Sequence, residues 1–123
     1  MRALLIVAHG SRRAESNDEV KSLTDEIRTR IESSTYSNFG FIHCAFLELA
    51  EPLIPDGLLE CASQGAEEVV VLPYFLSAGR HVTEDIPQIV EQAALTMPSV
   101  NIVIAPYLGS ARGLSDLMLE LAK

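Results

Sequence analysis

Short runs of apolar residues alternate along the chain with stretches in which apolar residues recur every three or four positions. The runs predict strands that are covered on both faces, at Ala3–Ala8, Phe39–Phe46, Val69–Phe75 and Val100–Ala105. The periodic stretches predict a helix after each strand. Strict alternation with short connections predicts a small doubly wound α/β fold, with a four-stranded parallel sheet, right-handed crossovers and helices on both faces.

Capping residues indicate where the first two helices begin and end. The first is expected to begin at about Asn17, because Ser16 and Glu19 have the spacing of a capping box. The second is expected to contain Pro52 in its first turn, where proline is tolerated, and to stop at Gly65 in a left-handed conformation.

The third helix is predicted to be capped by Thr83, which places Glu84 and Asp85 at the positive end of the helix dipole. Pro98 marks its end. The last helix is predicted from an apolar face made by Leu114, Leu117, Met118 and Leu121.

Length and composition favour one compact domain, residues 1–123, because 48% of the residues are hydrophobic and the size suits a single core. The apolar runs are too short to cross a bilayer and the start lacks a secretory signal, so we expect a cytoplasmic protein with no membrane partner. Cys44 and Cys61 lie seventeen positions apart without a CxxC pair. They are therefore interpreted as reduced, buried thiols.

A formal net charge of −8 argues against nucleic acid as a partner, since binding to the phosphate backbone normally requires a basic face. Several arginines nevertheless lie in the segments that follow predicted strands. These are Arg12, Arg13, Arg80 and Arg112. They are either solvated loop residues or contacts for an anionic substrate.

His9 and His81 are the strongest candidates for chemistry. Each lies just beyond the carboxyl end of a predicted strand, in a turn that contains glycine. Ligands of doubly wound folds bind at this edge, where the strand order reverses, commonly between the first and third strands. Neutral imidazole binds divalent metals and accepts protons near neutral pH. His43, inside a predicted strand, is interpreted as a hydrogen-bonded or edge-exposed residue without a role in the chemistry.

Three segments carry a resemblance to a known family: LIVAHGSR at 5–12, FLELAEP at 46–52 and PYFLSAGRHVTEDIP at 73–87. Together they resemble the sirohydrochlorin chelatases of the CbiX type, which belong to the class II, ATP-independent chelatases. The resemblance extends over nearly the whole chain, and the length of the chain matches the short, single-domain form of the family.

The resemblance implies insertion of cobalt, iron or nickel into sirohydrochlorin, on routes to cobalamin or siroheme. It implies that His9 is the general base and a metal ligand, that His81 is the second metal ligand, and that Glu51 contacts the substrate. It places one loop against the tetrapyrrole: Leu76, Ser77, Ala78, Gly79, Arg80 and His81. Because short forms resemble half of a duplicated chelatase, it also implies a homodimer.

The residue types fit this chemistry. Insertion needs partial dehydration of the ion, its placement over the ring and removal of two pyrrole protons, all of which histidines can assist. Glu48 or Glu51 could orient an imidazole or contact the ring, and Gly10 and Gly79 would let a flat ligand approach the backbone. No GxxxxGK[ST] loop occurs, so ATP use is unsupported.

No tightly bound cofactor is expected, because the divalent metal would be a substrate. Arg12, Arg13 and Arg80 are the candidates for contacts with the carboxylates of sirohydrochlorin.

Two alternative functions are also compatible with these residues. A histidine phosphatase also has His-Gly after its first strand, but that family expects an arginine immediately before the histidine, where this chain has Ala8. A non-catalytic carrier of metal or tetrapyrrole would use the same two histidines. Turnover separates a carrier from a chelatase, because only a chelatase releases the metallated ring.

Overall fold

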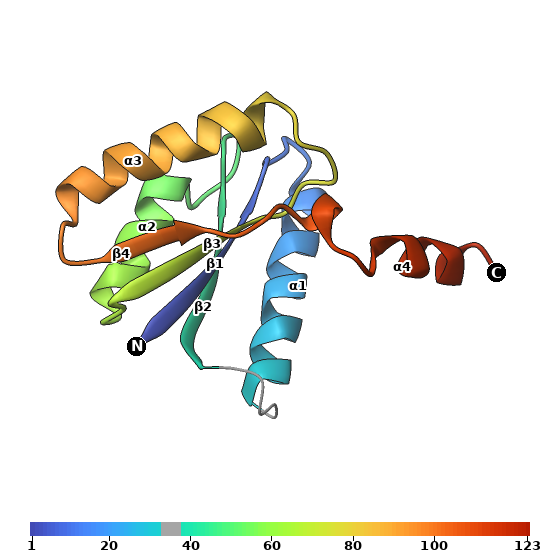
Figure 1. The fold of residues 1–123 in the computed structure, drawn as a ribbon, viewed down its shortest axis with the longest axis horizontal. Helices are drawn as coiled ribbons and strands as arrows, with labels where there is room; N and C mark the ends of the chain where they lie inside the picture. Colours follow the sequence, from blue (N-terminus) through green and yellow to red (C-terminus); the bar gives the residue numbers. More distant parts are fainter. Residues whose placement is uncertain (33–37) are drawn as a thin grey trace.

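The computed structural model describes residues 1–32 and 38–123, which form one sheet of four parallel strands with helices around it (Figure 1). The strands lie in the order β2-β1-β3-β4. Their bounds are β1 Arg2–Ala8, β2 Phe39–Phe46, β3 Glu68–Pro73 and β4 Asn101–Ile104. The predicted four-stranded parallel sheet is therefore confirmed, and its order reverses between β1 and β3 as expected.

In the described ranges, four α-helices and two single turns connect and follow the strands. The helices are α1 Ala14–Glu32, α2 Ile54–Ser63, α3 Ile86–Thr96 and α4 Leu114–Leu121. A π-helical turn, η1 (His81–Asp85), leads directly into α3, and a 3₁₀ turn, η2 (Leu108–Ser110), precedes α4. None of the helices in the described ranges combines the length and apolar character needed to cross a membrane.

The sheet separates two apolar layers, because successive side chains of a strand point to opposite faces. On β1, Leu5 and Val7 face a core that includes α2 and α3, whereas Leu4 and Ile6 face a core that includes α1. Figure 1 shows the same arrangement, with α1 on one face and the α2–α3 pair on the other. Helices on both faces of the sheet are thus confirmed.

The predicted start of the first helix is wrong by one turn. Helix α1 begins at Ala14, so Ser16 and Glu19 lie inside it rather than forming a capping box. The Ser11 hydroxyl accepts the Arg13 N–H at 3.0 Å, in the turn just before the helix. The Asn17 side chain then bonds both the N–H and the carbonyl of Ser11, at 2.9 and 2.8 Å, which closes the turn.

Two further helix starts differ from the prediction. Pro52 lies before α2, and Pro55 occupies the first turn that Pro52 was expected to occupy. Thr83 lies within η1 rather than capping a helix, and its hydroxyl bonds the Gly79 carbonyl. Other signals are confirmed: Gly65 adopts a φ of +97° after α2, and α3 ends just before Pro98.

The carboxyl-terminal helix does not pack on the sheet. Figure 1 shows α4 projecting away from the rest of the molecule, with the chain end beyond it. The helix forms where the apolar pattern predicts, but Leu117 and Leu121 are 61% and 86% exposed. Its apolar face therefore has no cover within the described chain.

Cys44 and Cys61 are both buried and carry free thiols, as predicted. Cys44, on β2, lies in the layer under α1, and Cys61, on the buried face of α2, lies in the other layer. Burial raises the pKa of the Cys61 thiol to about 12, because the thiolate would lose its hydration.

Candidate active site

The two candidate histidines meet at the carboxyl edge of the sheet, where β1 and β3 lie side by side. From β1 the chain crosses to β2, and from β3 it crosses to β4 on the other side, so the edge opens between them. The His9 and His81 rings lie 4.8 Å apart between centroids, inclined at 62°. Their side chains are 41% and 46% exposed, so a ligand has access to both.

His9 is oriented by its own turn. Its Nδ1 lies 2.9 Å from the Gly10 carbonyl oxygen, which can only accept, so Nδ1 carries the proton in this contact. In the neutral ring the lone pair then lies on Nε2, which is 3.4 Å from a Glu48 carboxylate oxygen. Two acceptors at this distance attract one another only when a proton or cation lies between them.

Glu48 reaches His9 because the loop after β2 is fastened to the turn after β1. The Leu47 and Glu48 N–H groups donate to the carbonyls of Ala8 and His9, at 2.9 and 3.0 Å. Gly10 has a φ of +93°, and a Cβ there would lie 1.7 Å from the Glu48 carbonyl oxygen. Gly10 therefore permits the close approach of these two backbones.

His81 is the first residue of η1, and its Nδ1 lies 2.7 Å from the Asp85 carboxylate. The Phe75 ring lies beside the same imidazole, with the ring centroids 6.3 Å apart. Neither Asp85 nor Glu48 was assigned to the site from the sequence. Glu48 was left open beside Glu51, and Asp85 was interpreted only as a helix-dipole carboxylate.

The loop between β3 and η1 is open to solvent along its length. Leu76 is 69% exposed, and Ser77, Ala78, Gly79 and Arg80 are exposed as well. The space in front of Gly79 is empty, since a Cβ there would meet nothing within 4 Å. This leaves the loop backbone accessible to a flat ligand.

Turn η2 contacts that loop through the backbone, which the sequence pattern did not predict. The Gly109 N–H donates to the Phe75 carbonyl at 2.9 Å. A Cβ on Gly109 would lie 1.8 Å from the Leu76 carbonyl oxygen, so the two segments touch backbone to backbone. A glycine after the fourth strand is the only sequence signal for this contact.

Glu51, predicted to contact the substrate, is not brought to the histidines. It is exposed and lines a separate hollow of about 330 Å³ between α1 and β2, with Pro52, His43 and Cys44 on the side of β2. His43 is half-buried, and burial lowers its pKa. Contact between Glu51 and the substrate stays a prediction.

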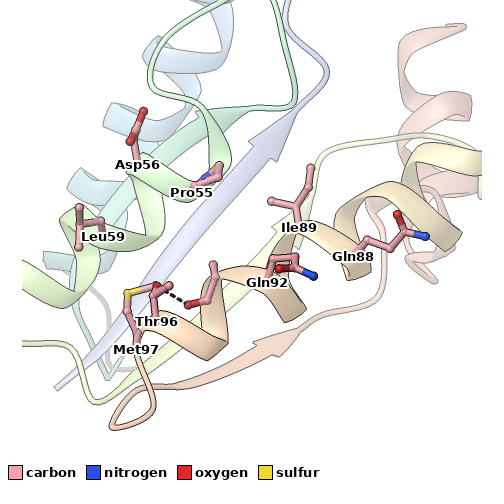
Figure 2. A pocket seen from close by; sticks show the side chains of 9 residues that line it. Pro55, Asp56, Leu59, Gln88, Ile89, Gln92, Thr96 and Met97 are labelled. Atoms are coloured by element: carbon pink, nitrogen blue, oxygen red, sulfur yellow. Dashed lines mark hydrogen bonds between the residues drawn. The ribbon is translucent and has the colours of Figure 1, made fainter.

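A groove of about 540 Å³ between α2 and α3 is also separate from the histidines. Figure 2 shows its walls, with Asp56 and Leu59 from α2 opposite Gln88 and Gln92 from α3. None of the residues predicted to handle metal or substrate lines it.

The predicted arginines remain at the surface. Arg13 and Arg80 are each 79% exposed and form ion pairs with Glu15 and Glu84, at 3.9 and 3.2 Å. Arg12 is exposed in the same turn as Arg13. Exposed pairs of this kind contribute little to stability, so these cations can exchange partners for a ligand carboxylate.

Within residues 1–32 and 38–123, no three His, Cys, Asp or Glu side chains converge closely enough to hold a metal ion. The site offers two imidazoles, with the Glu48 carboxylate beside His9. Nitrogen and oxygen donors of this kind suit cobalt, nickel, iron and zinc.

Comparison with known proteins decides the family. The model of the CbiX family matches residues 3–123, nearly the whole chain. The chain belongs to the CbiX family. This membership agrees with the resemblance of the three sequence segments and with the position of His9 and His81 in the fold.

Relatives of this CbiX chain include chelatases named for different metals. It is 36% identical over 115 residues to the chloroplastic sirohydrochlorin ferrochelatase of Arabidopsis thaliana, covering 94% of this chain and 48% of that protein. It is 29% identical over 123 residues to the sirohydrochlorin cobaltochelatase of Sulfolobus acidocaldarius, covering 100% of this chain and 91% of that protein.

A solved structure has the same fold. The sirohydrochlorin chelatase SirB from Bacillus subtilis subspecies spizizenii, in complex with cobalt, superposes with a TM-score of 0.85 at 28% identity. The match covers 97% of the CbiX chain and 48% of SirB. The chain thus spans about half the length of the plant relative and of SirB, and most of the length of the Sulfolobus relative.

Proposed function

We propose that this protein inserts a divalent metal ion into sirohydrochlorin without ATP, as a lyase of the cobaltochelatase or ferrochelatase type. The observation that carries the proposal is the pair of half-exposed imidazoles, 4.8 Å apart, at the point where the strand order reverses. Family membership and the names of the relatives support the same substrate. The acting unit would be the single domain predicted for residues 1–123.

The reaction replaces two pyrrole protons by the metal ion, so a hydrated M²⁺ and the free-base ring give the metallated ring and two protons. His9 would act as base and ligand, because Nε2 is its unprotonated nitrogen and lies at the open edge of the sheet. Glu48, 3.4 Å away, would stabilise the imidazolium that forms and pass the proton to water. His81 would hold the metal from the other side.

The macrocycle would lie over the exposed loop before η1. Leu76 offers an apolar surface to the ring, and the empty space at Gly79 lets the ring approach the backbone. Arg12, Arg13 and Arg80 lie around this edge and could receive the ring's carboxylates, offsetting the negative charge of the chain. Glu51 would contact the periphery of the ring, farther from the imidazoles.

The metal would be a substrate rather than a resident cofactor. Cobalt and iron are the ions in the names of the relatives, and imidazole with carboxylate accepts either, as well as nickel. Imidazole and carboxylate accept all three ions, so the pathway in which the protein acts would determine the physiological metal.

A homodimer in the cytoplasm completes the proposal. The uncovered apolar side chains of α4 support association of two copies, since an isolated helix of this length gains little stability in water by itself. Free, buried cysteines are consistent with a reducing compartment.

Turnover measured by absorbance tests the proposal. Sirohydrochlorin and cobalt(II) would be mixed anaerobically, in excess over the protein, and the conversion compared with a protein-free control. We expect many equivalents of metallated ring per protein, formed faster than in the control. A spectrum that shifts stoichiometrically without faster conversion would instead support a carrier, and an unchanged spectrum would contradict both.

A further inference from the structure

We propose that Asp85 is a positioning residue for His81: it accepts the Nδ1–H of the imidazole and thereby leaves Nε2 as the nitrogen that presents its lone pair at the open edge. The inference rests on the proposed function only in giving His81 a metal ion to bind. It concerns the tautomer and orientation of one ring, which are measurable without sirohydrochlorin.

The contact itself defines which nitrogen is protonated. His81 Nδ1 and Asp85 Oδ2 are 2.7 Å apart, the length of a strong, charge-assisted hydrogen bond. An ionised carboxylate can only accept, so the neutral imidazole must donate through Nδ1. Its Nε2 has no hydrogen-bond partner among the described residues, and it belongs to a ring that contacts His9 edge to face.

The unusual backbone of η1 provides the setting for this contact. The Ile86 N–H donates to the His81 carbonyl, five residues back, instead of the four of an α-helix. Ile86 is fully buried in the core under α2 and α3, so the carboxyl end of the turn is anchored. His81 and Asp85 therefore meet on a turn that is fixed to the core, although both side chains remain partly exposed.

The neighbouring carboxylate on the same turn has a different partner. Glu84 pairs with Arg80 at 3.2 Å, and no contact joins it to His81 among the described residues. It therefore provides a matched control: replacing either acid by its amide removes one negative charge from η1, but only the change at Asp85 alters a group bonded to the imidazole.

A carboxylate behind a ligating histidine fixes the ring and makes its other nitrogen a stronger donor to a metal ion. Loss of such a partner typically costs about 10- to 100-fold in metal affinity or activity. A purely structural aspartate would leave the tautomer of His81 and its metal affinity unchanged once the variant is folded.

Nitrogen NMR of protein labelled with ¹⁵N-histidine tests the tautomer directly. At pH 8, where an ordinary histidine is neutral, we expect His81 of the wild type to show a protonated Nδ1 and a bare Nε2. Asp85→Ala should lose this preference. Asp85→Asn should keep much of it, because the amide oxygen still accepts, and Glu84→Gln should leave it unchanged.

Cobalt(II) titration of the same four proteins, followed by the visible absorbance of the bound ion, supplies the second readout. We expect Asp85→Ala to weaken binding by about 10- to 100-fold, Asp85→Asn to weaken it less, and Glu84→Gln to match the wild type. Should Asp85→Ala not fold, the wild-type tautomer still tests the proposal, because a His81 ring protonated on Nε2 would overturn it.

The inference would be overturned by a wild-type His81 protonated on Nε2, or by an unchanged tautomer and unchanged cobalt affinity in folded Asp85 variants. Its failure is separable from failure of the proposed function. If the wild type metallates sirohydrochlorin and Asp85→Ala binds cobalt normally, only the inference is contradicted. If the tautomer is fixed and cobalt affinity depends on Asp85, but the protein shows no turnover, only the proposed function is contradicted.

Discussion

His9 and His81 are held by different means, one by a backbone carbonyl and the other by a carboxylate. The Gly10 carbonyl orients His9 through local backbone geometry, whereas Asp85 orients His81 through a side chain four residues away. In both contacts the partner is a hydrogen-bond acceptor, so the proton of the neutral ring lies on Nδ1. Under the proposed function, both Nε2 atoms would therefore be the nitrogens available to a metal ion or a pyrrole proton.

The two histidines were predictable because position and residue type agree: each follows a strand that flanks the reversal of strand order. The partner carboxylate was not predictable. Whether Glu48 or Glu51 approaches His9 depends on two backbone hydrogen bonds and on a positive φ of 66° at Leu49, which apolar patterns do not encode.

Replacement of the two carboxylates should separate their roles. We expect Glu48→Gln to lower kcat for metal insertion by about 10- to 100-fold, because its carboxylate lies beside the unprotonated nitrogen of His9. Glu51→Gln, outside contact with either histidine, should raise KM for sirohydrochlorin with little change in kcat. Steady-state kinetics of both variants check this, and a Glu51→Gln variant with the larger kcat loss would contradict it.

The buried Cys61 thiol predicts a loss of stability at alkaline pH. Its pKa is raised from 9.0 to about 12 in the folded chain, so above pH 9 the unfolded chain releases a proton that the folded chain retains. The unfolded state then binds fewer protons, and the free energy of unfolding falls as pH rises from 9 toward 12.

Urea denaturation of wild type and Cys61→Ala at pH 8, 9 and 10 measures this effect. The variant should be less stable at pH 8, because it leaves a small cavity, but it should show a shallower decline with pH. Equal slopes for the two proteins would assign the alkaline loss to other groups.

At the scale of elements, the edge that carries the histidines is built by four connecting segments, which touch in pairs through glycine. The turn after β1 meets the loop after β2 at Gly10, and turn η2 meets the loop before η1 at Gly109. The patterns predicted the strands and helices but not these contacts, because a glycine in a loop does not reveal which backbone it approaches.

The errors at helix starts have a common physical origin. Ser16 and Thr83 both have the chemistry of a cap, yet the chain continues as helix through them because hydrogen bonds just upstream begin the turn earlier. The Arg13 carbonyl accepts the Ser16 N–H, and the Gly79 carbonyl accepts the N–H groups of Val82 and Thr83. Several residues near each start have the chemistry of a cap, so the pattern places a helix end only to within a few residues.

Two glycine substitutions test the contact between η2 and the loop before η1. Gly109→Ala should lower the free energy of unfolding by about 1–3 kcal/mol, because the new Cβ would collide with the Leu76 carbonyl and the backbone must move. Gly79→Ala is the matched control, since its Cβ would enter empty space. Urea denaturation compares the two, and equal losses would show that η2 does not support the loop.

At the scale of the whole molecule, α4 is the element that the rest of the chain does not explain. Its apolar residues predicted a helix correctly, but Leu117, Met118 and Leu121 cover nothing in the described structure. Sequence periodicity reports that a face is apolar and does not report which surface buries it.

We predict that α4 contributes to a dimer interface. Sedimentation at micromolar concentration under reducing conditions should give a dimer for the wild type, and a monomer for the double variant Leu117→Glu, Leu121→Glu, because charges on the apolar face oppose its burial. Glu120→Gln, on the same helix, should remain dimeric. A strictly monomeric wild type would contradict the prediction.

The central claim is that His9 and His81 act together on the metal and on the pyrrole protons, and an initial-rate comparison tests it most directly. Anaerobic conversion of sirohydrochlorin by cobalt(II) would be followed for wild type, His9→Ala with His81→Ala, and His43→Gln as the matched histidine control outside the site. We predict that the double variant folds but falls to the protein-free rate, whereas His43→Gln keeps wild-type activity. A folded double variant that still accelerates insertion would contradict the account.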